Sequence, residues 1–372
     1  MNVFLSWISI AATSFSLGII ACKFSLMDAH ILTALVGISA IAALLAKRKI
    51  ISMIGIAAIW FYAGAMAYTL CRDSRTEQFV SIREENVVYI VEQAQRPSPS
   101  KPYHVLYISS FNNQKGSEKS HLVLYSRKPF KKIIEGSVVE LHKKNFMSKA
   151  KDGPIESYLA KENVIDIVFC DPEEIVCIGY MQPPALARII RNFKEKIVST
   201  AKKHLRKNSF AMFMSIFMGN RDYLAPGSEV KEGFGRWGIM HYIARSGLHL
   251  ALIAYLVSLP LIPIPAPGQI IILLQVLVCL LFWMLTWGSV SFSRALLIMG
   301  AAAAGRMFGL PFNIAYALSL AYLLLLALNP HLLFALDFQL TFALTAALIG
   351  ITKLKVITFQ KRERLKRKLP LG

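Results

Sequence analysis

Residues 233–250 form a largely apolar stretch, GFGRWGIMHYIARSGLHL, that contains several side chains able to ionise or hydrogen-bond. Four of them are candidates for a functional role: His241, Arg245, Ser246 and His249. On a helix, Arg245 and His249 share one face because they lie four positions apart. Inserting an arginine into a membrane helix costs about 2.5–3.5 kcal/mol, so such groups face a cavity or a polar partner. Two interpretations stay open: the four groups bond to neighbouring helices, or they line a pathway for a charged solute.

The sequence carries no motif typical of catalysis. It lacks the GxSxG, P-loop and HExxH patterns, and it has no run of metal-ligand spacing. His241 and His249 alone do not complete a metal site. We therefore expect a protein that is not an enzyme and that holds neither a metal ion nor a cofactor.

The sequence contains several apolar segments about as long as a bilayer crossing. Hydrophobic residues make up 55% of the 372 residues, and the mean hydropathy is +0.48. A span needs roughly 20 apolar residues. The expected spans are residues 3–22, 29–46, 50–70, 238–259, 270–287, 292–308, 313–328 and 331–351.

A polar segment with β-branched runs separates the third span from the fourth. Five short strands are expected at residues 87–91, 105–108, 122–125, 138–141 and 164–168. Strands of this number and length are typical of a small barrel or sandwich, and an OB-like barrel is one candidate. Cys170 and Cys177 lie in this segment, either as a disulfide in an oxidising compartment or as two ordinary thiols.

Residues 184–207 predict a basic amphipathic helix, with apolar side chains on one face. Three interpretations remain: a helix lying on anionic lipid headgroups, a helix that guides nucleic acid, and an ordinary packed helix. The formal net charge of +20 favours an anionic partner. The residues expected to bind DNA or lipid are Arg188, Arg191, Lys194, Lys202, Lys203 and Arg206.

The expected fold class is a polytopic α-helical membrane protein with an inserted small all-β, OB-like extracytoplasmic domain. Basic residues favour the cytoplasmic side, so residues 47–49 and the basic tail place both termini in the cytoplasm of a bacterial inner membrane. The expected order is three N-terminal helices (1–71), the β domain (72–182), the amphipathic helix (183–208), a second membrane region of about five spans (209–353) and the tail (354–372).

A set of residues spaced along the second membrane region resembles the signature of the ComEC-type competence proteins, inner-membrane channels for transforming DNA. The long motif around Ser246 carries most of this resemblance. The matching residues are Gly219, Arg221, Phe234, Gly238, His241, Ala244, Ser246, Gly247, Leu248, His249, Arg294, Ala295, Asn329, Pro330, Phe338, Gln339 and Leu340. The resemblance implies a smaller set of channel-lining or motif residues: Gly219, Arg221, Phe234, Gly238, His241, Arg245, Ser246, Gly247, His249, Arg294 and Gln339.

Three departures from the family pattern stand out. Asn220 replaces an acid, and Arg245 stands where the family has an apolar residue. The sequence ends at Gly372, before the further helices and the metallo-β-lactamase-like domain of many members. We therefore expect a shortened member without that domain.

The resemblance implies a component of a channel that takes up single-stranded DNA during natural transformation. Implied partners are single-stranded DNA, anionic lipid, other competence proteins and a separate chain that supplies missing helices. Two alternatives stay open: a small-anion permease on the same scaffold, and a non-transporting remnant or structural partner.

Overall fold

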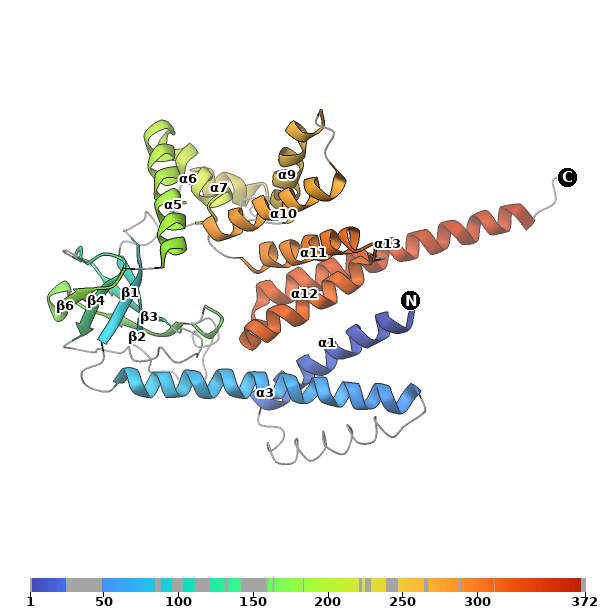
Figure 1. Ribbon diagram of the computed structural model, residues 1–372, viewed down its shortest axis with the longest axis horizontal. Coiled ribbons are helices and arrows are strands. Elements are labelled where there is room, and N and C mark those ends of the chain that lie inside the picture. The colour runs from blue at the N-terminus through green and yellow to red at the C-terminus, as the bar shows by residue number, and fades with distance from the viewer. Residues whose placement is uncertain are drawn as a thin grey trace. The chain divides into compact units, whose positions relative to one another are not determined.

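The computed structural model describes residues 2–24, 49–83, 88–95, 103–110, 121–130, 133–141, 159–162, 164–182, 184–220, 223–224, 229–238, 247–263, 267–286, 289–310 and 312–368. The chain divides into two compact units. One comprises residues 1–67, 263–276 and 293–372, and the other comprises residues 68–262 and 277–292. The first is helical, and the second holds a β-sheet with further helices (Figure 1).

Helices account for most of the described chain. They are α1 (Asn2–Lys23), α3 (Lys49–Arg83), α5 (Ala185–His204), α6 (Lys207–Ile216), α7 (Glu229–Arg236), α9 (Gly247–Ser258), α10 (Gly268–Leu285), α11 (Val290–Met307), α12 (Ile314–Leu328) and α13 (Leu336–Lys368). Three short 3-10 turns are η1 (Pro172–Glu174), η3 (Leu259–Leu261) and η4 (Pro330–Phe334).

The helices differ from the sequence expectation at several boundaries. Helix α3 continues past residue 70 to Arg83, and α13 runs through the basic tail to Lys368. Gly238 has a φ of +65° and follows the end of α7, so it does not begin a helix as we expected. The described part of that expected span begins at Gly247. The expected span at 29–46 lies outside the described residues.

One described helix, Gly268–Leu285, is long and apolar enough to cross a membrane. Four shorter apolar helical stretches occur among the described residues: Ile10–Lys23, Gly247–Leu261, Ile314–Leu328 and Leu336–Thr352. A crossing at 1.5 Å per residue needs about 17–25 residues. Among the described residues one helix therefore meets both requirements, length and apolarity, and a polytopic arrangement stays a prediction.

Close backbone contact joins α1 to α3 within the helical unit. A Cβ placed on Gly18 would lie 1.9 Å from the Phe61 carbonyl oxygen, and one placed on Gly64 would lie 2.0 Å from the Phe15 carbonyl oxygen. Only glycine permits this approach at both positions, which is how small residues pair helices in membranes. Phe15 also meets Trp60 edge-on, with ring centroids 6.2 Å apart.

Helix α1 packs against α12 as well. The Ser16 hydroxyl lies 2.7 Å from the Tyr322 hydroxyl, and Ser16 also donates to the Ala12 carbonyl at 2.8 Å. The Tyr322 ring meets Phe338 and Phe342 of α13, with centroids 5.2 Å apart in both cases. The N-terminal helix and the last two helices therefore share one packed cluster.

The sheet of the second unit has six strands in the order β5-β3-β2-β1-β4-β6. They are β1 (Val88–Gln95), β2 (His104–Ser110), β3 (His121–Ser126), β4 (Ser137–Leu141), β5 (Val164–Phe169) and β6 (Ile175–Tyr180). Every pairing is antiparallel except that of β3 with β5. The five predicted strands are confirmed, and β6 is an addition; the OB-like assignment stays a prediction.

Alternate residues of these strands form the core. Leu106, Leu122, Leu124 and Val168 are almost fully buried on one face. The intervening residues point to the opposite face, because side chains alternate along a strand. There Val105 and Val123 pack with Leu159 of the short helix at residues 159–161. Val164 joins them at the point where the β3–β5 register shifts. The sheet is therefore packed on both faces, and among the described residues the second face is covered by the residues around Leu159.

Candidate nucleic-acid interface and competence motif

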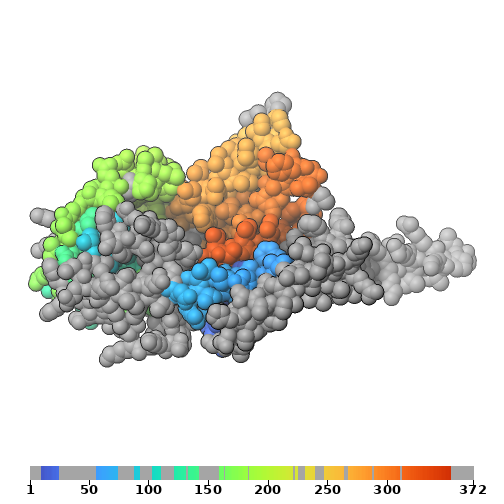
Figure 2. Space-filling view, turned by 60° about the horizontal axis from the view of Figure 1, so that its bottom comes forward, coloured from blue at the N-terminus to red at the C-terminus, as the bar shows by residue number. Residues whose placement is uncertain are grey.

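Helix α5 combines a basic surface with uncovered apolar side chains. Leu186, Ile189 and Phe193 are exposed, at 61%, 63% and 53% of their surface. They lie at positions i, i+3 and i+7, and so share one helical face. Helix α5 lies at the molecular surface, drawn yellow-green in Figure 2. Its first half therefore presents an apolar stripe with nothing packed on it among the described residues.

The second half of α5 is anchored. Ala201 is buried against Phe210, Met214 and Met218 of the following segment, and Ile197 packs beside them. The sequence prediction of one continuous apolar face is thus resolved into two parts. The C-terminal part holds α6, and the N-terminal part is open.

Two of the expected DNA- or lipid-binding arginines have protein partners. Arg191 Nη1 lies 3.3 Å from Glu135 Oε2, which ties α5 to the turn before β4. Arg188 Nη1 donates to Gln182 Oε1 at 3.2 Å. Lys194 is half-buried and is also engaged in an interaction. These three side chains therefore already interact with other groups of the protein.

The remaining expected cations gather at the C-terminal end of α5. Lys202 and Lys203 lie in its last turn, and Arg206 is the N-cap residue that precedes α6. All three are exposed. Positive charge at a helix C-terminus is favourable, because the unpaired carbonyls there carry partial negative charge. This cluster, Lys202, Lys203 and Arg206, is the exposed cationic end of α5.

The structure describes part of the competence-like motif. Gly219 follows α6 with a φ of +76°, and the Asn220 N–H behind it donates to the Met214 carbonyl at 2.8 Å. Left-handed backbone of this kind favours glycine. Phe234 lies in α7, half-buried. Arg221, His241, Arg245 and Ser246 lie outside the described residues.

Helix α9 opens with the end of the same motif. Gly247 is its first residue, and His249 lies half-buried in its first turn with an interaction of its own. Leu250 is buried, and its carbonyl lies 3.9 Å from Cys279 Sγ of α10. The end of the motif is thus packed near α10.

Two later motif residues fix helix ends and contacts in the helical unit. Arg294 of α11 donates from Nη1 to the Thr341 carbonyl and to Thr345 Oγ1 of α13. Its guanidinium carbon lies 6.0 Å from the centre of the Phe342 ring. Gln339 Nε2 donates to the Leu333 carbonyl at 2.9 Å. In this structure Arg294 joins two helices, which is the role of a packing group.

An aromatic cluster that the sequence reading missed lies at one end of the sheet. Tyr103 precedes β2, Tyr125 is near the end of β3, and Phe169 ends β5. Arg127 follows in the turn after β3, with its guanidinium carbon 6.0 Å from the centre of the Tyr103 ring. The sequence does place Tyr125 near the end of one expected strand, with Arg127 two positions later, and Phe169 directly after another expected strand. The parallel β3–β5 pairing that brings the two rings together was not predicted.

Burial suppresses the reactivity of the nearby thiol. Cys170 is buried, and desolvation raises its pKa to about 12, with the Glu174 and Asp171 carboxylates adding to the rise. Cys177 is exposed, and all five cysteines are free thiols. Among the residues that the structure describes, no group of three or more His, Cys, Asp or Glu side chains is placed to hold a metal ion.

The sequence of residues 216–370 matches the family model described as "Competence protein". Over that region the chain is similar to ComEC-type competence proteins. A curated relative is ComE operon protein 3 of Bacillus subtilis strain 168, to which the chain is 31% identical over 151 residues. The alignment covers 38% of the chain and 19% of the relative, so the chain spans about a fifth of the relative's length. No solved structure matches the chain.

Proposed function

We propose that the chain is a component of an inner-membrane channel that takes up single-stranded DNA during natural transformation. The observation that carries this proposal is the competence-family match over residues 216–370. The described helices in that region are α7 and α9 to α13, and α10 is apolar and long enough to span a bilayer. The other apolar helices of the chain complete a polytopic arrangement in the proposal.

The β domain and α5 stand on the outer side of the membrane in this proposal, with both termini in the cytoplasm. The exposed cationic end of α5 contacts DNA phosphates, because Lys and Arg release counterions from the backbone when they bind it. The exposed stripe of Leu186, Ile189 and Phe193 favours a second contact on the same helix, with the surface of an anionic bilayer. The two contacts lie at opposite ends of α5 and are compatible.

Motif residues have separate parts in the proposal. His241, Arg245, Ser246 and His249 belong to the sequence motif at residues 233–250, and they line the path of the strand. Arg294 and Gln339 hold the helices that surround it, since both donate to groups on α13 or on η4. The proposed partners are single-stranded DNA, other competence proteins and a chain that supplies further helices.

The test is binding of the purified, detergent-solubilised chain to fluorescently labelled single-stranded DNA across a salt series. The proposal predicts binding at micromolar concentration or below in low salt, with an affinity that falls steeply as salt rises. A monodisperse protein that binds no DNA at low salt would contradict it.

A further inference from the structure

The rings of Tyr103, Tyr125 and Phe169 lie on the sheet face opposite the main core. Leu106, Leu124 and Val168 of the same strands point into that core. Each of the three rings lies an odd number of positions from the core residue of its own segment. Because side chains alternate along a strand, the rings lie on the face opposite the core. Leu159 covers the middle of that side, whereas Phe169 at its end keeps 41% of its surface exposed.

The three rings form a compact platform. Tyr125 and Phe169 are register partners in the parallel β3–β5 pair, with ring centroids 5.5 Å apart and planes inclined by only 31°. Tyr103 meets both rings edge-on, at 6.0 Å from Tyr125 and 5.7 Å from Phe169. Arg127 borders the Tyr103 ring. Two nearly parallel rings with a guanidinium beside them offer planar surfaces at about the spacing of neighbouring strands.

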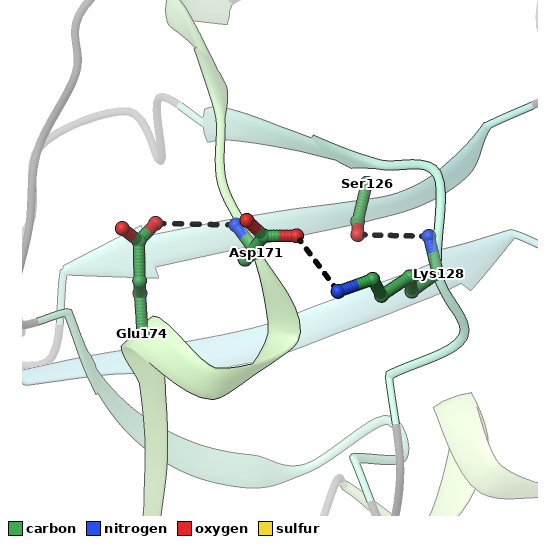
Figure 3. A network of polar contacts seen from close by, with 4 residues as sticks. All are labelled: Ser126, Lys128, Asp171 and Glu174. Carbon is green, nitrogen blue, oxygen red and sulfur yellow. Dashed lines mark hydrogen bonds and ion pairs between the residues drawn. The ribbon is translucent and has the colours of Figure 1, made fainter.

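Hydrogen bonds hold the backbone beneath these rings. The Cys170 N–H donates to the Tyr125 carbonyl at 3.1 Å, which joins the ends of β3 and β5. Figure 3 shows the polar network in the turns that follow: the Lys128 N–H donates to Ser126 Oγ at 3.2 Å, and the Asp171 N–H donates to Glu174 Oε2 at 3.1 Å. Lys128 Nζ lies 3.7 Å from Asp171 Oδ1 and bridges the two turns. The platform is therefore preorganised.

The charges around the platform point to base contacts rather than phosphate contacts. Lys128 is paired with Asp171, and the Glu174 carboxylate accepts a backbone N–H. Arg127 is left beside the ring surface, where a guanidinium stacks on a planar base. Aromatic rings on a β domain bind single strands by stacking on unpaired bases, which duplex DNA keeps stacked inside the helix. Here Phe169 is exposed, and Tyr103 and Tyr125 are half-buried beside it.

We propose that Tyr103, Tyr125, Phe169 and Arg127 form a base-stacking platform for single-stranded DNA on the β domain. The proposal rests on the proposed uptake function and adds a site that acts separately from the cationic end of α5. Stacking on such a platform depends little on salt, whereas phosphate contact depends on it strongly.

The experiment compares two probes on the full-length chain in detergent: labelled oligo-dT and an abasic oligonucleotide with the same number of phosphates. The intact protein is expected to bind oligo-dT roughly tenfold more tightly, at a ratio that stays constant as salt rises. The variant Tyr125→Ala/Phe169→Ala should bind the two probes with nearly equal affinity. The slope of its log affinity against log salt should stay that of the intact protein. Phe169→Leu keeps the apolar volume and removes the π-face, so it should lose part of the ratio even where the double variant folds poorly.

Tyr180→Ala is the matched control, because Tyr180 is an exposed aromatic residue of the same sheet, on β6, with 52% of its surface exposed. It should leave the ratio unchanged. Equal binding of oligo-dT and the abasic strand by the intact protein would overturn the platform and leave the uptake proposal standing. Loss of the ratio in Tyr180→Ala to the same extent would also overturn it. A protein that binds neither probe would overturn both proposals.

Discussion

Neutralising the exposed cationic end of α5 should flatten the salt dependence of DNA binding. The variant is Lys202→Gln/Lys203→Gln/Arg206→Gln, which removes three exposed charges and no ion pair that the structure records. Each phosphate contact on a single strand contributes about 0.7 to the slope of log K against log salt, so the slope should fall by about 2. Between 0.1 and 0.4 M salt, the intact protein should then lose affinity by about 20-fold more than the variant does.

The assay is fluorescence anisotropy of labelled oligo-dT with the detergent-solubilised protein. Arg191→Gln is the matched control, because Arg191 already pairs with Glu135 at 3.3 Å, half-buried. It should change the slope little, and removing this ion pair should cost about 0–1 kcal/mol of stability. A slope in the triple variant that stays within about 0.5 of the intact protein's slope would refute phosphate contact by this cluster. Retained binding of the same variant to neutral vesicles, with loss of binding to anionic ones, would assign the cluster to lipid.

Three further results are expected. Gly18→Ala should cost about 1–3 kcal/mol of unfolding free energy and so lower the thermal unfolding midpoint in detergent, because its Cβ would meet the Phe61 carbonyl. Gly300→Ala places its Cβ with nothing within 4 Å and should not lower the midpoint. Equal shifts in the two variants would contradict the close α1–α3 contact. Thr345→Val removes a hydroxyl acceptor of the α11 arginine and should cost about 1–3 kcal/mol; an unchanged midpoint would argue against that hydrogen bond. Because its raised pKa of about 12 keeps Cys170 protonated at pH 8, a maleimide should label Cys177 and spare Cys170 in the folded protein, and equal labelling rates, followed by mass spectrometry, would refute the burial of Cys170.

Local patterns in the sequence were enough to predict most elements. The five predicted strands appear because their β-branched runs are bounded by turn residues, and α5 appears because its apolar residues repeat at helical spacing. Strand β6 was missed: it is an edge strand, and five of its six residues are exposed. Its pairing with β4 supplies what the local pattern does not.

The candidate site was less predictable because its parts meet through tertiary pairing. Tyr125 and Phe169 are 44 positions apart in the sequence and become neighbours only through the parallel β3–β5 ladder. Arg191 reads as one cation among several on α5, and only the fold brings Glu135 to it. From the sequence, Arg294 was predicted to line the channel, whereas in the structure it donates hydrogen bonds to two acceptors on α13. Charge and spacing identify a candidate residue, but the acceptor it meets depends on packing.

The central claim is that this chain has a part in DNA uptake, and the most direct measurement is the transformation frequency of a strain that carries the gene. The strain is compared with its deletion mutant and with the mutant complemented in trans, using donor DNA labelled to follow entry into the cytoplasm. The account predicts that deletion lowers both entry and transformation, and that complementation restores them. Unchanged entry and transformation in the deletion mutant would contradict the account.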